Sequence, residues 1–201
     1  MNYKKAFYEI KQYYVTTLLV FLNILIFLIC TFTGNLLYNK GVFYVWNVVM
    51  QREYYRVLSA VFLHFDIEHL FNNMILLFFI GRIVEKHTGH IAYSIIYLLS
   101  GIGGNLFSAF CEIITSRYVV SAGASGAVFG LTGALLVLVL FHKGKLEGIR
   151  WQGVVIMILL SIYNGFTADN INNAAHIGGL VIGIIGTFIV SVIIAIGRKN
   201  N

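Results

Sequence analysis

Six long apolar segments constrain the fold of this chain more than any other feature. They cover about residues 15–37, 69–86, 91–115, 124–142, 153–168 and 174–197. A helix needs roughly 20 mainly apolar residues to cross a bilayer, and these segments reach or approach that length. Hydrophobic residues make up 59% of the 201 residues, charged residues 11%, and there is no proline, which is unlike an ordinary soluble domain. The sequence therefore predicts an all-α membrane protein built as a six-transmembrane helical bundle.

The polar stretches between these segments are too short for a second folded domain. We expect a cytoplasmic N-terminal segment at 1–14, one six-helix domain at 15–197 and a short cytoplasmic tail at 198–201. A signal peptide is not expected, because the first apolar segment is long, lacks a small-residue cleavage site and is followed by more segments. Cys30 and Cys111 lie in apolar segments, where free cysteine behaves as a small hydrophobe, so we expect neither a disulfide nor a cysteine nucleophile.

Lysine and arginine are divided unequally between the two sides that six spans create. The side with both termini carries ten of them: Lys4, Lys5, Lys11, Arg82, Lys86, Lys143, Lys145, Arg150, Arg198 and Lys199. The other side carries four: Lys40, Arg52, Arg56 and Arg117. Short loops rich in Lys and Arg stay in the cytoplasm, so both termini are expected there. The net charge of +6 then reflects membrane topology, and no nucleic acid partner is expected.

Two further patterns concern packing and the outer surface. The segment 38–68 is rich in aromatic residues, which favour the headgroup level of a bilayer, and we expect it to lie in or on the outer interface.

Glycines repeat at helical spacing in the fourth and sixth apolar segments: Gly126, Gly130 and Gly133 in one, Gly179, Gly183 and Gly186 in the other. Small residues let membrane helices approach closely. The fourth and sixth helices should therefore pack against each other or a shared neighbour.

Polar residues cluster at the start of the second, fourth and sixth apolar segments. They are His69, Asn72 and Asn73, then Ser125, then Asn172, Asn173 and His176. With a cytoplasmic N-terminus these three helices all begin on the outer side, so the clusters converge on one level. Polar groups at membrane depth are costly and mark a pathway or a site.

The depth of Ser125 follows from helix geometry. Ser125 and His142 are 17 positions apart, about 25 Å along a helix, whereas the hydrocarbon core is about 30 Å thick. Ser125 should therefore lie below the outer edge. The segment 118–124 must then enter the membrane as a loop, which is tolerated when it is buried in protein or lines a water-filled cavity.

These residue types can perform nucleophilic catalysis. A serine hydroxyl needs a base to take its proton, and histidine is the usual base. Ser125 stands near a helix N-terminus, which favours developing negative charge. His69 and Asn73 are four positions apart and share one helix face, where both can donate to an oxyanion. Asp169 is the acidic residue nearest to His176 in the sequence and belongs to a loop. A Ser–His dyad is therefore a simpler interpretation than a Ser–His–Asp triad.

Three motifs resemble the signature elements of the rhomboid intramembrane serine proteases. They are GASG at 123–126, HFDIEHLFNN at 64–73 and AHIGG at 175–179, within a similarity that runs from about Arg56 to Gly183. The resemblance implies that Ser125 is the nucleophile and His176 the base, with His69, Asn73 and the Ser125 backbone amide as the oxyanion hole. It gives supporting roles to His64, Gly123 and Phe129, the last with its ring against His176.

The resemblance also covers one structural position and shows two departures. Glu85, in GRIVEK at 81–86, matches an acidic residue of the family near the inner end of the second span and is expected to be structural. The family's Trp-Arg pair in the loop reads Tyr55-Arg56, and Ala60 stands where a proline is common. Both departures lie outside the catalytic set and bear on the rigidity of the loop.

The expected function is hydrolysis of peptide bonds in or near transmembrane segments of membrane proteins. The partners are these substrates and the lipid bilayer, in a plasma membrane of bacterial type with the active site facing outside. No metal or other cofactor is expected, because His87 and His90 are too few and on the wrong side, and no HExxH motif exists. Two alternatives are a small transporter, which should show repeats with interrupted helices near the midplane, and a catalytically inactive rhomboid relative that binds membrane proteins, which typically lacks the Ser or the His.

Overall fold

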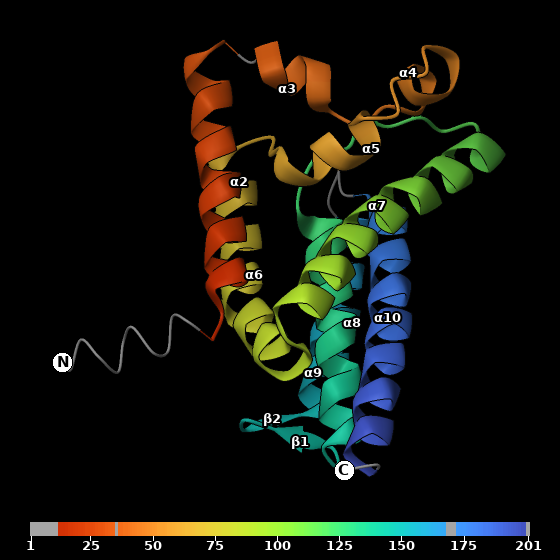
Figure 1. The fold of residues 1–201 in the computed structure, drawn as a ribbon. Helices are drawn as coiled ribbons and strands as arrows, with labels where there is room; N and C mark the ends of the chain where they lie inside the picture. The colour runs from red at the N-terminus through yellow and green to blue at the C-terminus, as the bar shows by residue number, and fades with distance from the viewer. Residues whose placement is uncertain (1–11, 35, 168–171, 200–201) are drawn as a thin grey trace.

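The computed structural model describes residues 12–34, 36–167 and 172–199 (Figure 1). Six long helices dominate it: α2 (Tyr14–Phe32), α6 (Ile67–Thr88), α7 (His90–Thr115), α8 (Ser125–Phe141), α9 (Trp151–Thr167) and α10 (Asn173–Lys199). Four short helical pieces lie between α2 and α6: α3 (Leu36–Gly41), α4 (Val45–Met50), α5 (Arg56–Ser59) and the 3-10 turn η1 (Ala60–Phe62). A small antiparallel hairpin, β1 (Lys145–Leu146) and β2 (Ile149–Arg150), joins α8 to α9. Lys4, Lys5, Lys11 and Asp169 lie outside the described residues.

The long helices confirm five of the six expected segments to within a few residues. The first segment, 15–37, is wrong at its end, because α2 stops at Phe32 and a new helix begins at Leu36. Gly34 between them has a φ of 68°, a left-handed conformation that glycine adopts without strain and that ends helices. Among the described residues, α2, α6, α7 and α10 are long and apolar enough to cross a membrane, and α8 and α9 are shorter apolar helices.

Consecutive long helices run in alternating directions along the bundle (Figure 1). The N-terminal ends of α6, α8 and α10 therefore lie at the same end of the molecule, the upper end in Figure 1. The start of α2, the end of α10 and the hairpin lie at the opposite end. After α7 the chain crosses the upper end and descends to the start of α8, which lies below the upper ends of α2 and α7. The three polar clusters of the sequence thus share one end of the fold.

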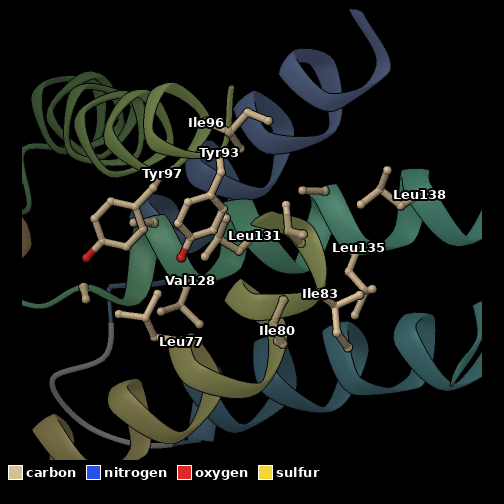
Figure 2. Packing of buried hydrophobic residues seen from close by; sticks show 14 of the residues in the cluster. Leu77, Ile80, Ile83, Tyr93, Ile96, Tyr97, Val128, Leu131, Leu135 and Leu138 are labelled. Carbon is tan, nitrogen blue, oxygen red and sulfur yellow. The ribbon is translucent and has the colours of Figure 1, made fainter. Parts of the chain in front are cut away.

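Helix α8 forms the centre of the bundle and packs against α6, α7, α9 and α10. Leu131, Leu135 and Val139 on α8 are almost completely buried, as expected for a helix that is apolar on all sides. Figure 2 shows the side chains that surround it: Leu77, Ile80 and Ile83 from α6 and Tyr93, Ile96 and Tyr97 from α7. This core holds the first turn of α8 in place.

The glycines of α8 and α10 meet, which confirms the packing that the sequence predicts. The α-carbon of Gly179 faces the carbonyl oxygen of Gly126, and that of Gly183 faces the carbonyl oxygen of Gly130, each too closely for a Cβ atom. The two backbones therefore touch along two successive turns. Because Gly126 follows Ser125 and Gly179 lies one turn after His176, this contact brings the first turns of α8 and α10 together.

The loop between α2 and α6 is organised by Arg56, which is 6% exposed. Its Nη1 donates to the carbonyl oxygens of Asn39 and Val42 at 3.1 and 2.9 Å, and its Nε donates to Glu53 Oε2 at 2.6 Å. The Tyr55 ring lies beside the guanidinium at 5.6 Å. The loop is thus held by the arginine of the Tyr-Arg pair.

At the opposite end of the bundle, Glu85 joins α2 to α6. Its carboxylate is fully buried and accepts from the backbone N–H groups of Val15 and Thr16, at 3.0 and 2.7 Å, and from Thr16 Oγ1 at 2.6 Å. His90 Nδ1 lies 2.6 Å from the same carboxylate. These contacts agree with the structural role expected for Glu85, because the first N–H groups of a helix need acceptors.

Candidate active site

Ser125 is the first residue of α8 and is partly exposed, whereas Gly126, Ala127 and Val128 behind it are buried. The segment that leads to it is held by backbone hydrogen bonds. Ser121 and Phe43 exchange two N–H···O bonds of 2.9 Å, and Gly123 N donates to Ala60 O at 2.9 Å. The position of Ser125 is therefore set by the loop between α2 and α6 as well as by α8.

Gly123 is required both by its backbone conformation and by its neighbour. Its φ is 137°, a region that residues with a Cβ rarely adopt. A Cβ at this position would also lie 2.7 Å from Cε1 and 2.8 Å from Nε2 of His69. The His69 imidazole therefore lies directly against the backbone two residues before Ser125.

His64 and His69 form a pair at the start of α6. Their ring centroids are 5.2 Å apart, and Asp66 caps the helix by accepting from His69 N at 2.8 Å. His64 is 3% exposed, and its burial, with a smaller effect of the neighbouring His69, lowers the pKa of His64 to about 3. The neutral ring lies with its Nε2 3.4 Å from Ala124 N, which donates to it. His64 thus ties the start of α6 to the residue before Ser125.

Asn73 lies one turn after His69 on α6 and is buried. Its Nδ2 donates to His69 O at 3.0 Å. A side-chain amide has two N–H donors, and this bond uses one of them. Among the hydrogen bonds of the described residues, the second N–H of Asn73 takes no part.

His176 lies in the first turn of α10 and is 8% exposed. Its ring stacks on the Phe129 ring, with centroids 4.2 Å apart and planes 8° apart. This is the ring contact that the family resemblance implies. Since Phe129 lies one turn after Ser125 on α8, the imidazole is held beside the turn that begins with Ser125. Asn172 caps α10 by accepting from Ala175 N at 3.0 Å, and Asn173 is the first residue of the helix.

Within the described residues, no hydrogen bond joins Ser125 Oγ to the His176 ring, and His176 Nδ1 is buried without a partner. Catalytic hydrogen bonds are often long in ligand-free enzymes and tighten when substrate binds. No three His, Cys, Asp or Glu side chains of the described residues could hold a metal ion together. The arrangement places a serine hydroxyl at a helix N-terminus, a buried imidazole beside the same turn, and the side chains of His69 and Asn73 on α6.

Three polar residues near this site, Glu112, Ser108 and Ser121, are absent from the sequence-based prediction. Glu112 in α7 is 5% exposed and is linked through Ser108 and Asn172 to Ser121. The sequence does carry a signal for it, because an acidic residue inside an apolar segment is expensive in a membrane and points to a role.

Comparison with known proteins agrees with the motifs. The family model of the rhomboid domain matches residues 51–193. Rhomboid protease GluP of Bacillus subtilis (strain 168) is 36% identical over 135 residues, which is 67% of this chain and 26% of that protein. Putative rhomboid protease YdcA of the same organism is 30% identical over 159 residues, 79% of this chain and 73% of that protein. RHOMBOID-like protein 4 of Arabidopsis thaliana is 35% identical over 146 residues, 72% and 36% of the two chains.

The chain spans between a quarter and about half of the length of the first curated relatives that it matches. The family match nevertheless extends from the loop before α5 into α10 and contains all three polar clusters. Together with the apolar helices that are long enough to cross a bilayer, it identifies an integral membrane protein. The chain belongs to the rhomboid family.

Proposed function

We propose that this protein is an intramembrane serine endopeptidase, which hydrolyses peptide bonds in or near transmembrane segments of other membrane proteins. The observation that supports it best is the meeting of the first turns of α8 and α10. The Gly126–Gly179 backbone contact and the Phe129–His176 stack bring a partly exposed serine and a buried histidine to the same place. Two Bacillus relatives, named Rhomboid protease GluP and Putative rhomboid protease YdcA, support the same activity.

In the proposed reaction, His176 takes the hydroxyl proton of Ser125 as Oγ attacks the carbonyl carbon of the substrate. The negative charge that develops on the carbonyl oxygen is stabilised by the Ser125 backbone N–H, by the His69 ring and by the second N–H of Asn73. Helix N-terminal N–H groups have no partner within the helix, which suits the Ser125 amide for this role. His176 then gives the proton to the leaving amine, and a water molecule attacks the acyl-enzyme by the same route.

We also propose that all six long helices cross the membrane, with both termini in the cytoplasm and the start of α8 facing the outside of the cell. The alternating helix directions and the excess of Lys and Arg at one end support this orientation. Helix α8 has 17 residues, about 25 Å, so Ser125 lies below the outer surface of a bilayer. Substrates should therefore be cut near their outer end.

The substrate must expose a carbonyl group before it can react. Carbonyl groups in a membrane helix are engaged in intrahelical hydrogen bonds, so a substrate segment has to unwind locally. Small or helix-breaking residues near the outer end of the substrate should favour cleavage.

The test is cleavage of a reporter transmembrane substrate in liposomes by the wild type, Ser125→Ala and His176→Ala at matched folding. Loss of product in both variants is expected, with a fluorophosphonate probe that labels the protein only when Ser125 is present. A folded wild type that neither cuts nor labels across several substrates would instead favour the inactive relative that binds membrane proteins.

A further inference from the structure

A continuous chain of hydrogen bonds links α7, the segment before Ser125 and the start of α10. Glu112 Oε1 accepts from Ser108 Oγ at 2.7 Å. Asn172 Nδ2 donates to Ser108 Oγ and to Ser121 Oγ, each at 2.6 Å. We call these four residues the Glu112 network. Its side chains are buried or nearly so, with exposures of 5% for Glu112, 0% for Ser108 and 7% for Ser121.

The donors and acceptors of this network are fully matched around Asn172. A side-chain amide has two N–H groups, and here one goes to each serine. Its Oδ1 accepts from Ala175 N at 3.0 Å, which caps α10. The other carboxylate oxygen of Glu112 accepts from Val119 N at 3.3 Å. Buried networks that are satisfied in this way fix one arrangement, because any partial break leaves a costly unpaired group.

The two ends of the Glu112 network lie behind the two halves of the proposed dyad. Ser121 is four residues before Ser125, and Val119 belongs to the same segment. Asn172 caps the helix that carries His176 in its first turn. Helix α7, which holds Glu112 and Ser108, contributes none of the residues of the proposed oxyanion hole or dyad. The network therefore joins the support of the nucleophile to the support of the base through a third helix.

We propose that Glu112 and Asn172 are positioning residues for catalysis. They hold the segment 116–124 and the start of α10 at a fixed separation, so that Ser125 and His176 stay aligned. A buried carboxyl group in an apolar helix is costly unless it is hydrogen-bonded, and these bonds compensate that cost while they set the alignment. This inference rests on the proposed protease function.

The decisive variant is Asn172→Asp, because it keeps the cap and breaks the link between Asn172 and Ser108. An aspartate is as good an N-cap as asparagine, but it has no N–H to donate to Ser108 Oγ, whose single O–H already goes to Glu112. Ser108→Ala is the second variant and removes the link between Glu112 and Asn172 without changing a residue of α10 or its cap. Asn23→Ala is the matched control: Asn23 is fully buried in α2 and donates to Leu19 O at 2.8 Å within its own helix.

For each folded variant, kcat, KM, Tm and the second-order rate of fluorophosphonate labelling are measured in the same detergent. In Asn172→Asp and Ser108→Ala, kcat and the labelling rate should fall by about 10- to 100-fold, since a misplacement of about 1 Å costs that much, while KM stays unchanged. Asn23→Ala should lower Tm and leave the labelling rate unchanged.

Suppose that the wild type is labelled and that both network variants are labelled equally fast but have a lower Tm. The network would then only stabilise the fold, and this result would overturn the positioning role without affecting the proposed protease function. If the folded wild type neither labels nor cleaves, the protease function itself fails, and the positioning role falls with it.

Discussion

Replacing Gly179 by alanine should separate the two turns on which the proposed dyad depends. A Cβ at Gly179 would fall on the carbonyl oxygen of Gly126, far inside the 3.0 Å that such contacts respect. Both atoms belong to helix backbones, so no flexible side chain can yield. Helices α8 and α10 must instead move apart by about 1 Å at this level, the kind of backbone shift that overpacking forces. Gly126 adjoins Ser125, and Gly179 lies one turn from His176.

Two effects of different size follow from this shift. Overpacking of this kind costs about 1–3 kcal/mol of stability, and a displacement of about 1 Å between reacting groups costs up to roughly 100-fold in rate. We expect Gly179→Ala to lower kcat by about 10- to 100-fold in protein that is still folded. Reporter cleavage in liposomes and the fluorophosphonate labelling rate measure this, with thermal unfolding recorded in parallel.

The same helix provides two controls. A Cβ at Gly186 would lie 3.5 Å from Ile96 Cγ1, an ordinary contact, so Gly186→Ala should keep both the stability and the rate of the wild type. A Cβ at Gly183 would meet the carbonyl oxygen of Gly130, one turn further from His176, so Gly183→Ala should lose similar stability but less rate. Unchanged kcat and labelling in Gly179→Ala would refute the reasoning that this backbone contact aligns the dyad.

Three further predictions concern single residues. Gly123→Ala should abolish labelling of Ser125, because it combines a φ of 137° with a Cβ placed 2.7 Å from His69; wild-type labelling would contradict this. The pKa of His64 is about 3 in the folded protein, against an ordinary value of 6.5, so the unfolded chain takes up the proton at a higher pH than the folded protein does. The free energy of unfolding should therefore fall as the pH drops from about 6.5 towards 3, by at most about 1.4 kcal/mol per pH unit. Unfolding titrations should show a shallower dependence in His64→Gln, and an identical slope would rule out His64 as the source. Glu85→Ala should cost several kcal/mol of stability by leaving the N–H groups of Val15 and Thr16 buried without acceptors, each worth about 1–3 kcal/mol, and an unchanged Tm would contradict that role.

The helices could be predicted from the sequence because length and apolar character determine them almost alone. The end of α2 carries a sequence signal, because Thr33, Gly34 and Asn35 interrupt the apolar run and Gly34 adopts the left-handed conformation that ends the helix. The expected segment runs past it because Leu36 and Leu37 are apolar again. The hairpin after α8 leaves no pattern in the sequence, because its strands have two residues each, too few for any alternation to appear. The short helices before α6 could not be predicted, because the aromatic content of this segment indicates that it lies at the membrane interface but does not indicate its secondary structure.

Part of the candidate site could also be predicted from the sequence, and part of it could not. The shared level of His69, Ser125 and His176 follows from alternating helix directions, and the contact between α8 and α10 follows from the spacing of glycines. The Glu112 network does not follow, because Asn172 is 64 positions from Ser108 and 51 from Ser121. Hydrogen bonds between such distant residues depend on three-dimensional packing, which residue spacing does not encode.

The attachment of α2 through Glu85 determines which residues a shortened version of this protein would have to keep. The family match starts at residue 51, after α2, yet the buried carboxylate within that match takes two of its backbone donors and one hydroxyl from Val15 and Thr16. A fragment cut at the edge of the family resemblance would keep the acceptor and lose these three donors. The hydrogen-bonded unit therefore extends beyond the residues that the family model matches and includes α2.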